Sequence, residues 1–495
     1  MNPPSPLPDA VALDGVTPGT KDTLGGKAYS INKMRAMGLP VPPAFALPTH
    51  VCAKYHDNGR ALPDEVWQQV LRQLREVEAQ TGRRFGAGPS PLLVSVRSGA
   101  AQSMPGMMDT VLNLGLTPEL RDVLAAETGD EPWAQDTWTR FRTSYASIVS
   151  KGQGVEPPAD PYEQLRAAIG AVFDSWTNER VRAYRDRHGL GTGGGTAVTV
   201  QAMVFGNRDE QSGTGVMFSR DPATGAAVLY GEWLARAQGE DVVSGEKTPS
   251  RLDTLHTGRP ALYAELERVA AVLEAEHSDL VDIEFTVESD RLYILQCRTG
   301  KRSPTAAVRI AVELARSGVI GKEEALQRIS AEQVERIAES GAVRADRQVL
   351  ATGIAAGPGA AVGQAVHDLD LARDLAGHGV AVVLVRPATA PDDVPVMFES
   401  VAVVTEFGGS TSHAALVCRE IGLPCVVGCG AGTVDTLTGK TVTVDGATGT
   451  VFEGDATETT TVERDEYLTE LLSYLPSPVP DGHPLAALAG ILERA

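Results

Sequence analysis

The sequence of 495 residues has few cysteines, no long apolar run and fewer basic than acidic residues. Its five cysteines are odd in number and form no Cys-x-x-Cys pair, which argues against a disulfide framework and a zinc site. No apolar run reaches roughly 18 residues and no signal peptide is evident, so we expect a soluble, cytoplasmic protein without a membrane partner. The net charge of −20 argues against nucleic acid as a partner.

The residues that are present describe a globular chain of several domains. Hydrophobic residues make up 42% and charged residues 22%, and the length suffices for about three domains. Segments with helical periodicity alternate with β-branched segments. This pattern predicts a multidomain α/β and α+β fold.

The stretch from Glu406 to Gly422 is the most informative in the chain. The β-branched residues 401–405 predict a buried strand, and residues 414–421 predict a short helix that ends at Gly422. His413 would lie at the N-terminus of that helix, where unpaired amides and the helix dipole disfavour the protonated imidazole. A neutral His413 could accept and hold a phosphoryl group, although a hydrogen-bonded helix cap would show the same local pattern.

Three glycine-rich stretches are candidates for phosphate binding. Gly25-Gly26 precede a predicted helix with Lys27 at its start, so backbone amides and one positive charge can approach a phosphate. Arg97 follows a predicted strand and precedes a Met-Pro-Gly-Met-Met loop, which suggests a fixed clamp and a mobile cover. Ser212-Gly213-Thr214-Gly215 is a further candidate loop over phosphate. Ordinary connecting loops, or burial against a neighbouring domain, are the alternatives.

A predicted hairpin carries the candidate metal–nucleotide site. Alternation places Asp282 and Glu284 on one face of its first strand, and Gln296 and Arg298 on one face of its second strand. Carboxylate and amide oxygens suit Mg²⁺, and a guanidinium suits a polyphosphate. A solvated hairpin face would show the same alternation.

Taken together, these stretches resemble the pyruvate, phosphate dikinase family over nearly the whole chain, from Leu24 to about Gly454. The motifs that carry the resemblance are the runs 94–116, 204–207, 212–222, 230–232, 237–243, 282–302 and 408–415. Thr411-Ser412-His413 is similar to the dikinase form of the motif rather than to the phosphoenolpyruvate synthase form.

The resemblance implies an ATP-grasp nucleotide-binding region, a helical linker and a swivelling phosphohistidine domain. The expected boundaries are an ATP-grasp N-terminal subdomain at 1–195, its C-terminal subdomain at 196–303, the linker at 304–348, the phosphohistidine domain at 349–456 and a tail at 457–495.

The resemblance also implies roles for individual residues. Glu284 and Gln296 would ligate Mg²⁺, and His413, with Arg97 and Thr411, would be catalytic. The implied nucleotide contacts are Lys27, Arg97, Gln201, Met203, Val204, Ser212, Gly213, Thr214, Gly215, Asp282, Glu284, Gln296 and Arg298. In the family chemistry ATP gives its terminal two phosphates to the histidine, inorganic phosphate removes one as pyrophosphate, and phosphohistidine remains.

The chain departs from the family at its C-terminal end. About 40 residues follow Gly454, too few for the eight βα units of the family's barrel. We therefore expect the phosphoryl acceptor to be pyruvate on a separate barrel protein, or another small molecule. The expected assembly is a homodimer. A stand-alone small-molecule kinase of the antibiotic phosphotransferase type and a non-catalytic nucleotide-binding subunit are the alternatives.

Overall fold

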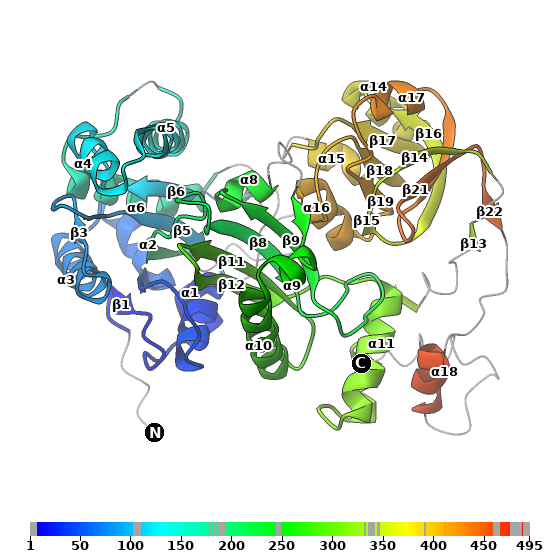
Figure 1. Cartoon of the computed structure of the whole chain (residues 1–495), viewed down its shortest axis with the longest axis horizontal. Helices are drawn as coiled ribbons and strands as arrows, with labels where there is room; N and C mark the ends of the chain where they lie inside the picture. The colour runs from blue at the N-terminus through cyan, green and yellow to red at the C-terminus, as the bar shows by residue number, and fades with distance from the viewer. Residues whose placement is uncertain are drawn as a thin grey trace. The chain divides into compact units, whose positions relative to one another are not determined.

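The computed structural model describes residues 7–101, 110–153, 155–178, 181–182, 185, 195–243, 249–330, 333–334, 342–343, 347–390, 393–410, 412–458, 466–475 and 488. The chain divides into two compact units, whose helices and strands are labelled in Figure 1. The first unit comprises residues 1–208 and 287–296, and the second comprises residues 209–286 and 297–495. No helix in the described part of the chain is long and apolar enough to span a membrane.

The first unit is built on an antiparallel five-stranded sheet. Its strands, in spatial order, are β1 (Val11–Ala12), β2 (Ala44–Leu47), β7 (Ala197–Ala202), β5 (Val94–Gly99) and β6 (Thr110–Leu114). The central strand β7 is buried along its whole length. The expected strand before the Met-Pro-Gly-Met-Met loop is therefore confirmed, whereas the loop itself, residues 104–108, lies outside the described residues.

Helices pack their apolar faces against this sheet. They are α1 (Lys21–Ala36), α2 (Thr49–Asp57), α3 (Asp64–Thr81), α4 (Pro118–Thr128), α5 (Glu131–Ile148) and α6 (Pro161–Ser175), and β3 (Arg84–Phe85) pairs with β4 (Pro91–Leu92) beside them. The helices α4, α5 and α6 each begin with a proline in the first turn and a capping Thr or Asp, which fixes where they start. The buried residues of α2 to α6 and of β2, β5, β6 and β7 form one continuous core.

A second five-stranded sheet has the order β10-β9-β8-β11-β12. Its strands are β8 (Gly213–Phe218), β9 (Tyr230–Ala235), β10 (Ser250–Arg251), β11 (Val281–Glu288) and β12 (Arg291–Thr299). The helices α8 (Gly239–Val243), α9 (Thr254–Gly258) and α10 (Pro260–His277) lie between β9 and β11 in the chain. The predicted hairpin that carries Asp282 and Arg298 is thereby confirmed as β11 and β12.

The expectation of a loop at Ser212–Gly215 is wrong, because β8 begins at Gly213 and all four residues are buried. The rings of Trp233 and Phe285 stack at 5.9 Å with an interplanar angle of 7°. A Cβ at Gly213 would lie 2.2 Å from the Trp233 ring, and a Cβ at Gly215 would lie 2.6 Å from the Phe285 ring. These two glycines therefore make room for an aromatic pair within the sheet, which a sequence pattern does not distinguish from a flexible loop.

The rest of the second unit contains an eight-stranded sheet in the order β14-β21-β20-β16-β17-β18-β19-β15. The strands are β14 (Val349–Thr352), β15 (Ile354–Gly357), β16 (Ala360–Val366), β17 (Val382–Arg386), β18 (Ala402–Thr405), β19 (Cys425–Val427), β20 (Thr441–Asp445) and β21 (Thr450–Glu453). The four strands from β16 to β19 are parallel, and the remaining pairs are antiparallel.

Both faces of this sheet are apolar. The connecting helices are α14 (Leu369–Gly377), α15 (Val394–Met397), α16 (His413–Ile421) and α17 (Thr433–Leu437). Along β17, Val382 and Leu384 join a core with Ala415 of α16, whereas Val383 and Val385 join a separate core on the opposite face. The buried residues of α16 hold this helix, which begins at His413, against one face of the sheet.

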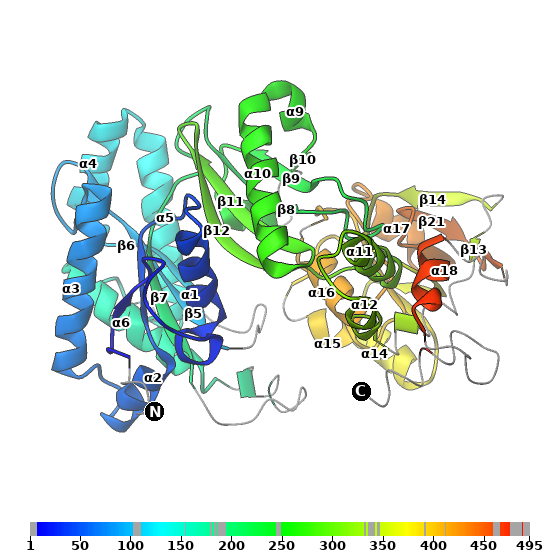
Figure 2. The ribbon, with the colours of Figure 1, turned by 90° about the horizontal axis from the view of Figure 1, so that it is seen from below.

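A segment after this sheet packs against the helices that precede it. The helices α11 (Pro304–Arg316) and α12 (Lys322–Gln327) share a core with α18 (Glu466–Ser473), and Figures 1 and 2 show α18 beside α11. The strands β13 (Ala342–Val343) and β22 (Thr457–Glu458) pair antiparallel. The segments that precede and follow the eight-stranded sheet in the chain therefore pair with each other.

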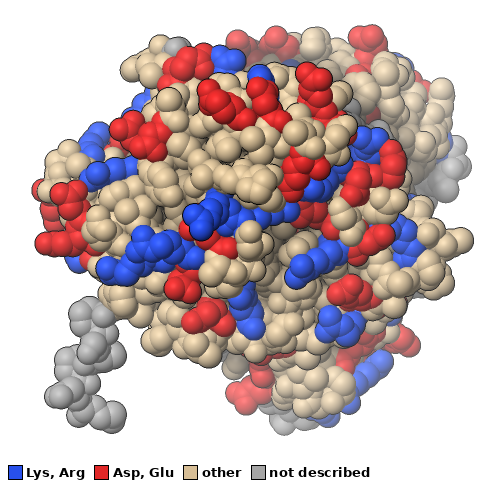
Figure 3. All heavy atoms as spheres, turned by 60° about the vertical axis from the view of Figure 1, so that its left-hand side comes forward, with Lys and Arg blue, Asp and Glu red and all other residues tan. Residues whose placement is uncertain are grey.

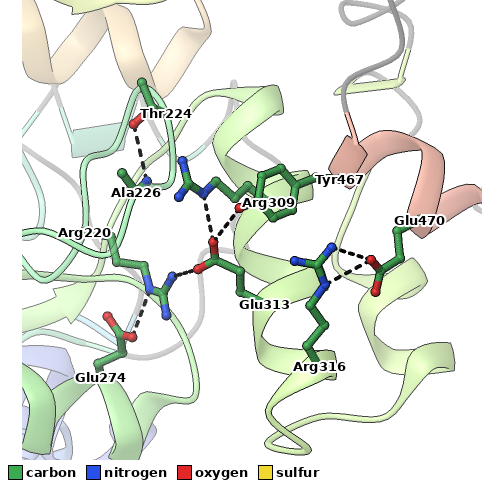
Figure 4. Close-up of polar contacts among 9 residues, drawn as sticks. All are labelled: Arg220, Thr224, Ala226, Glu274, Arg309, Glu313, Arg316, Tyr467 and Glu470. Atoms are coloured by element: carbon green, nitrogen blue, oxygen red, sulfur yellow. Dashed lines mark hydrogen bonds and ion pairs between the residues drawn. The ribbon is translucent and has the colours of Figure 1, made fainter.

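Charged residues connect α11 to its neighbours (Figure 4). Glu313 accepts hydrogen bonds from Arg309 at 2.9 Å and from the Tyr467 hydroxyl of α18 at 3.1 Å, and its other oxygen pairs with Arg220 at 2.5 Å. Burial alone would raise the pKa of Glu313, but the hydrogen bonds from Arg309 and Arg220 outweigh it and lower that pKa. This carboxylate is therefore held ionised between the sheet and α18.

Charge is mixed on the face of the molecule drawn in Figure 3, where Lys and Arg side chains lie among Asp and Glu side chains. The acidic side chains are therefore not spread uniformly over this face. Mixed surfaces of this kind generate no strong field of one sign.

Candidate functional site

The strand, glycine turn and helix expected around His413 are confirmed. β18 ends at Thr405, and α16 begins at His413, with the Ser412 side chain accepting from the amide of Ala415 at 3.5 Å. Gly422 ends the helix in the left-handed conformation at φ 68°. His413 is therefore fixed on the first turn of a nine-residue helix, where the backbone amides favour an anion.

A threonine from another segment contacts the ring of His413. The Thr389 hydroxyl lies 3.0 Å from Nδ1 of His413. The loop that carries Thr389 is held by Asp393, whose carboxylate accepts from the amide of Ala390 at 3.0 Å and pairs with Arg386 at 3.3 Å. Asp393 is 2% exposed, so these interactions are shielded from water. With Nδ1 engaged, Nε2 is the nitrogen available for chemistry.

The electrostatic surroundings of His413 favour the neutral ring. Burial lowers the pKa of His413 below its ordinary value of 6.5, and the carboxylate of Asp393 opposes this only in part. The sequence also predicted a neutral ring, on the basis of the helix dipole, but burial is the main cause. A half-buried neutral imidazole is a suitable nucleophile at pH 7.

The turn before α16 is held by close contacts within the second unit. The amide of Ser410 donates to a carboxylate oxygen of Glu232 at 2.5 Å, and the Arg419 guanidinium donates to the Ser410 carbonyl. A Cβ at Gly409 would lie 2.3 Å from the Glu232 carboxylate, so a larger residue there would displace that carboxylate. Thr411, expected to be catalytic, lies outside the described residues.

The hairpin β11–β12 places the predicted acid and guanidinium together. Arg298 donates to one carboxylate oxygen of Asp282 at 2.8 Å, and Asp282 is 4% exposed. Burial raises the pKa of Asp282, and Arg298 opposes this. Its other oxygen, Oδ1, is buried and has no hydrogen-bond partner among the described residues. Glu284 is half-buried on β11, and Gln296 is half-buried on β12.

In the first unit, Lys27 and Arg97 lie on segments that contact each other. The helix α1 begins earlier than expected, at Lys21, but Gly25 interrupts it with φ 74° and ψ 157° and it resumes at Gly26. The amide of Gly26 donates to Ala100, just beyond β5, at 2.9 Å. The expected glycine break before Lys27 is therefore present, and it packs against the end of the strand that carries Arg97.

The expected nucleotide contacts Gln201, Met203 and Val204 lie at the end of β7 and just beyond it. Gln201 is 2% exposed and donates to the Pro42 carbonyl at 3.4 Å. The amide of Met203 donates to the Leu93 carbonyl at 2.9 Å, and both Met203 and Val204 are half-buried. In the second unit, the Thr214 hydroxyl bonds to the Phe285 carbonyl at 3.0 Å. The Ser212 hydroxyl bonds to Asp209 at 2.6 Å.

Sequence reasoning missed Thr389, Asp393 and Glu232. The first two lie in the Arg386–Asp393 segment that connects two strands, where a Thr four residues before an Asp carries no distinctive signal. Glu232 lies in a motif that carried the resemblance, but nothing in its local sequence indicates a contact with Ser410. Only the folded structure brings these residues to His413 and its turn.

The second unit contains a domain that presents a histidine at a helix N-terminus. Residues 58–262 match the pyruvate phosphate dikinase AMP/ATP-binding domain, and residues 380–449 match the mobile domain of PEP-utilising enzymes. The chain belongs to the pyruvate, phosphate dikinase family.

Relatives from plants and bacteria agree with this assignment. The chain is 42% identical to pyruvate, phosphate dikinase 2 of Zea mays, covering 83% of this chain and 51% of the relative. It is 39% identical to pyruvate, phosphate dikinase of Rhizobium meliloti (strain 1021), covering 88% of this chain and 56% of the relative. The chain thus spans about half the length of the curated relatives it matches.

A solved structure of Enzyme I matches 34% of this chain and 58% of its own chain at 21% identity, with a TM-score of 0.14.

Proposed function

We propose that this chain is an ATP-dependent phosphotransferase that phosphorylates its own His413. The observation that carries the proposal is the contact between Thr389 and Nδ1 of His413 at the start of α16. This contact orients the ring and leaves Nε2 as the nucleophile, and burial keeps the ring neutral. A histidine that served only as a helix cap would not require a second segment to hold its other nitrogen.

The proposed chemistry balances as two transfers. Nε2 of His413 attacks the β-phosphorus of ATP, the bond to the α-phosphate oxygen breaks, and AMP leaves with that bond's electron pair. Nδ1 keeps its proton throughout and donates a hydrogen bond to the Thr389 hydroxyl oxygen. Inorganic phosphate then takes the terminal phosphoryl group as pyrophosphate, and phosphohistidine remains.

The nucleotide end of the site is also part of the proposal. Lys27, Arg97 and Arg298 would bind the phosphates, since all three carry permanent or nearly permanent positive charge. The donor set fits Mg²⁺, because Glu284 and Gln296 supply hard oxygen atoms and the buried Oδ1 of Asp282 has no hydrogen-bond partner among the described residues. Mg²⁺ held by Glu284 and Gln296 would neutralise phosphate charge.

The acceptor of the phosphoryl group is proposed to be pyruvate bound to a barrel domain or barrel protein, or another small molecule. The family supports pyruvate, because the matched relatives are pyruvate, phosphate dikinases. Adding candidate acceptors to the isolated phosphoenzyme, and measuring which of them removes the phosphoryl group, separates these acceptors.

The proposal is tested by incubating the protein with Mg-ATP and inorganic phosphate and locating acid-labile phosphate by mass spectrometry. We expect the phosphate on His413 and its loss in His413→Ala. The control is His378→Ala, because His378 is an exposed histidine of the same domain, with contacts only to its own helix among the described residues. Equal labelling of the wild type and His413→Ala would overturn the proposal.

A further inference from the structure

Trp133, near the start of α5, is held in a fixed place within the first unit. The helix begins after Asp130, whose carboxylate accepts from the amide of Trp133 at 2.9 Å. The indole is 5% exposed, and its Nε1–H donates to the side-chain oxygen of Asn207 at 3.1 Å. A buried indole N–H usually finds such a partner. Here the partner lies on the segment that follows β7.

The segment after β7 is packed around the same indole. The rings of Phe205 and Trp133 meet edge to face at 5.2 Å. The guanidinium of Arg208 lies 5.8 Å from the Trp133 ring and pairs with Glu127 at 3.8 Å and with Glu288 at 3.6 Å. Three side chains of one short segment, those of Phe205, Asn207 and Arg208, therefore contact Trp133.

This segment carries two of the expected nucleotide contacts, Met203 and Val204. No helix or strand holds residues 203–212, which the structure describes completely. On one side the amide of Met203 bonds to the Leu93 carbonyl at 2.9 Å. On the other side Phe205 and Asn207 are buried at 2% and 9% exposure. Met203 and Val204 thus lie between the hydrogen bond to Leu93 and the residues that contact Trp133.

We propose that Trp133 is a positioning residue for the nucleotide, which sets the backbone of Met203 and Val204 through its hydrogen bond to Asn207 and its contact with Phe205. This inference rests on the proposed function, because it assumes that the chain binds ATP. Trp133 does not touch the reacting atoms, so its loss weakens nucleotide binding and leaves the phosphoryl transfer step unchanged.

The experiment compares Trp133→Phe, Asn207→Ala and the double variant with a control, Trp138→Phe. Trp138 lies on the same helix, where it packs against Phe141 and Arg142. We expect the Kd of Mg-ATP, measured by calorimetry, to rise about tenfold in Trp133→Phe and in Asn207→Ala, the size of one lost buried hydrogen bond. The double variant should bind no more weakly than either single variant.

The rate of His413 phosphorylation at saturating ATP separates positioning from general damage. It should be unchanged in all four variants, and Trp138→Phe should bind ATP like the wild type. A Kd for Trp133→Phe equal to that of Trp138→Phe, or an equal loss of saturated rate in both, would overturn the inference. If Trp133→Phe does not fold, Asn207→Ala decides alone. A wild type that binds no ATP overturns the proposed function itself, and with it this inference.

Discussion

The hydroxyl of Thr389 and Nδ1 of His413 lie 3.0 Å apart, although 24 residues separate them in the chain. Thr389 comes from the loop after β17, and His413 begins α16, so two crossover connections of one parallel sheet meet at this contact. Parallel strands bring the ends of their connections to one edge of a sheet. The contact makes the ring orientation a property of the fold rather than of the local sequence.

Replacing Thr389 tests this contact. We expect Thr389→Val to slow phosphorylation of His413 about tenfold, since one hydrogen bond that selects the ring tautomer is lost. Thr389→Ser keeps the hydroxyl and should retain most of the rate. The measurement is the initial rate of acid-labile phosphate formation.

Thr436→Val is the matched control, because Thr436 is an exposed threonine of the same domain that bonds only to its own helix among the described residues. If Thr389→Val and Thr436→Val retain equal rates, the hydroxyl has no role in orienting His413.

The pH dependence of the reaction follows from the lowered pKa of His413. Burial disfavours the protonated ring, so His413 stays neutral at pH values where an ordinary histidine is half protonated, near 6.5. The rate should therefore decline at a lower pH than it would with an ordinary histidine, as the pH falls through the folded-state pKa. The pH profile of the single-turnover rate checks this, and a midpoint above 6.5 would contradict it.

The same shift affects stability. Because the folded-state pKa is below the unfolded one, the unfolded chain binds the proton more readily, and the folded domain loses stability as the pH falls below 6.5. His413→Gln, which cannot be protonated, should lose less stability than the wild type between pH 7 and pH 5. Urea unfolding at the two pH values measures the difference, and equal losses would show that His413 does not contribute.

Glu284 is expected to act through Mg²⁺. Glu284→Gln should raise the Mg²⁺ concentration needed for half-maximal ATP binding about tenfold, because a charged oxygen ligand is replaced by a neutral one. The control is Glu267→Gln, an exposed glutamate of α10. Calorimetric titrations with ATP at fixed Mg²⁺ concentrations provide the comparison, and identical Mg²⁺ dependence in both variants would exclude Glu284 as a ligand.

The packing of α18 on α11 makes a prediction about stability. Leu471 is fully buried in the core shared by these helices, so Leu471→Ala should lower the free energy of unfolding by about 3 kcal/mol. Leu371 is 49% exposed on α14, and Leu371→Ala should change it by less than about 0.5 kcal/mol. Urea unfolding of both variants tests this, and equal effects would mean that α18 is not part of the folded core.

The parts of the site that the sequence predicted are those that depend on local patterns. The helix after His413 could be predicted because its glycine end, its small residues and the preceding β-branched strand are contiguous. The pairing of Asp282 with Arg298 could be predicted because a short hairpin fixes which side chains share a face.

The parts that sequence reasoning missed depend on contacts between distant segments. Glycines at 213 and 215 favour a loop in sequence, but the stacked rings of Trp233 and Phe285 require them inside a strand. The residues after 456 were predicted to form a tail, yet α18 packs against α11. The amphipathic pattern of a helix shows that one face is buried but not which segment covers it.

The central claim is that His413 receives its phosphoryl group from the β-position of ATP. The most direct measurement supplies ATP labelled at either the β- or the γ-phosphate, with inorganic phosphate, and follows acid-labile label on His413. We expect β-label on His413 and γ-label in pyrophosphate. Label from the γ-position alone, or no label on a wild type that binds ATP, would contradict the account.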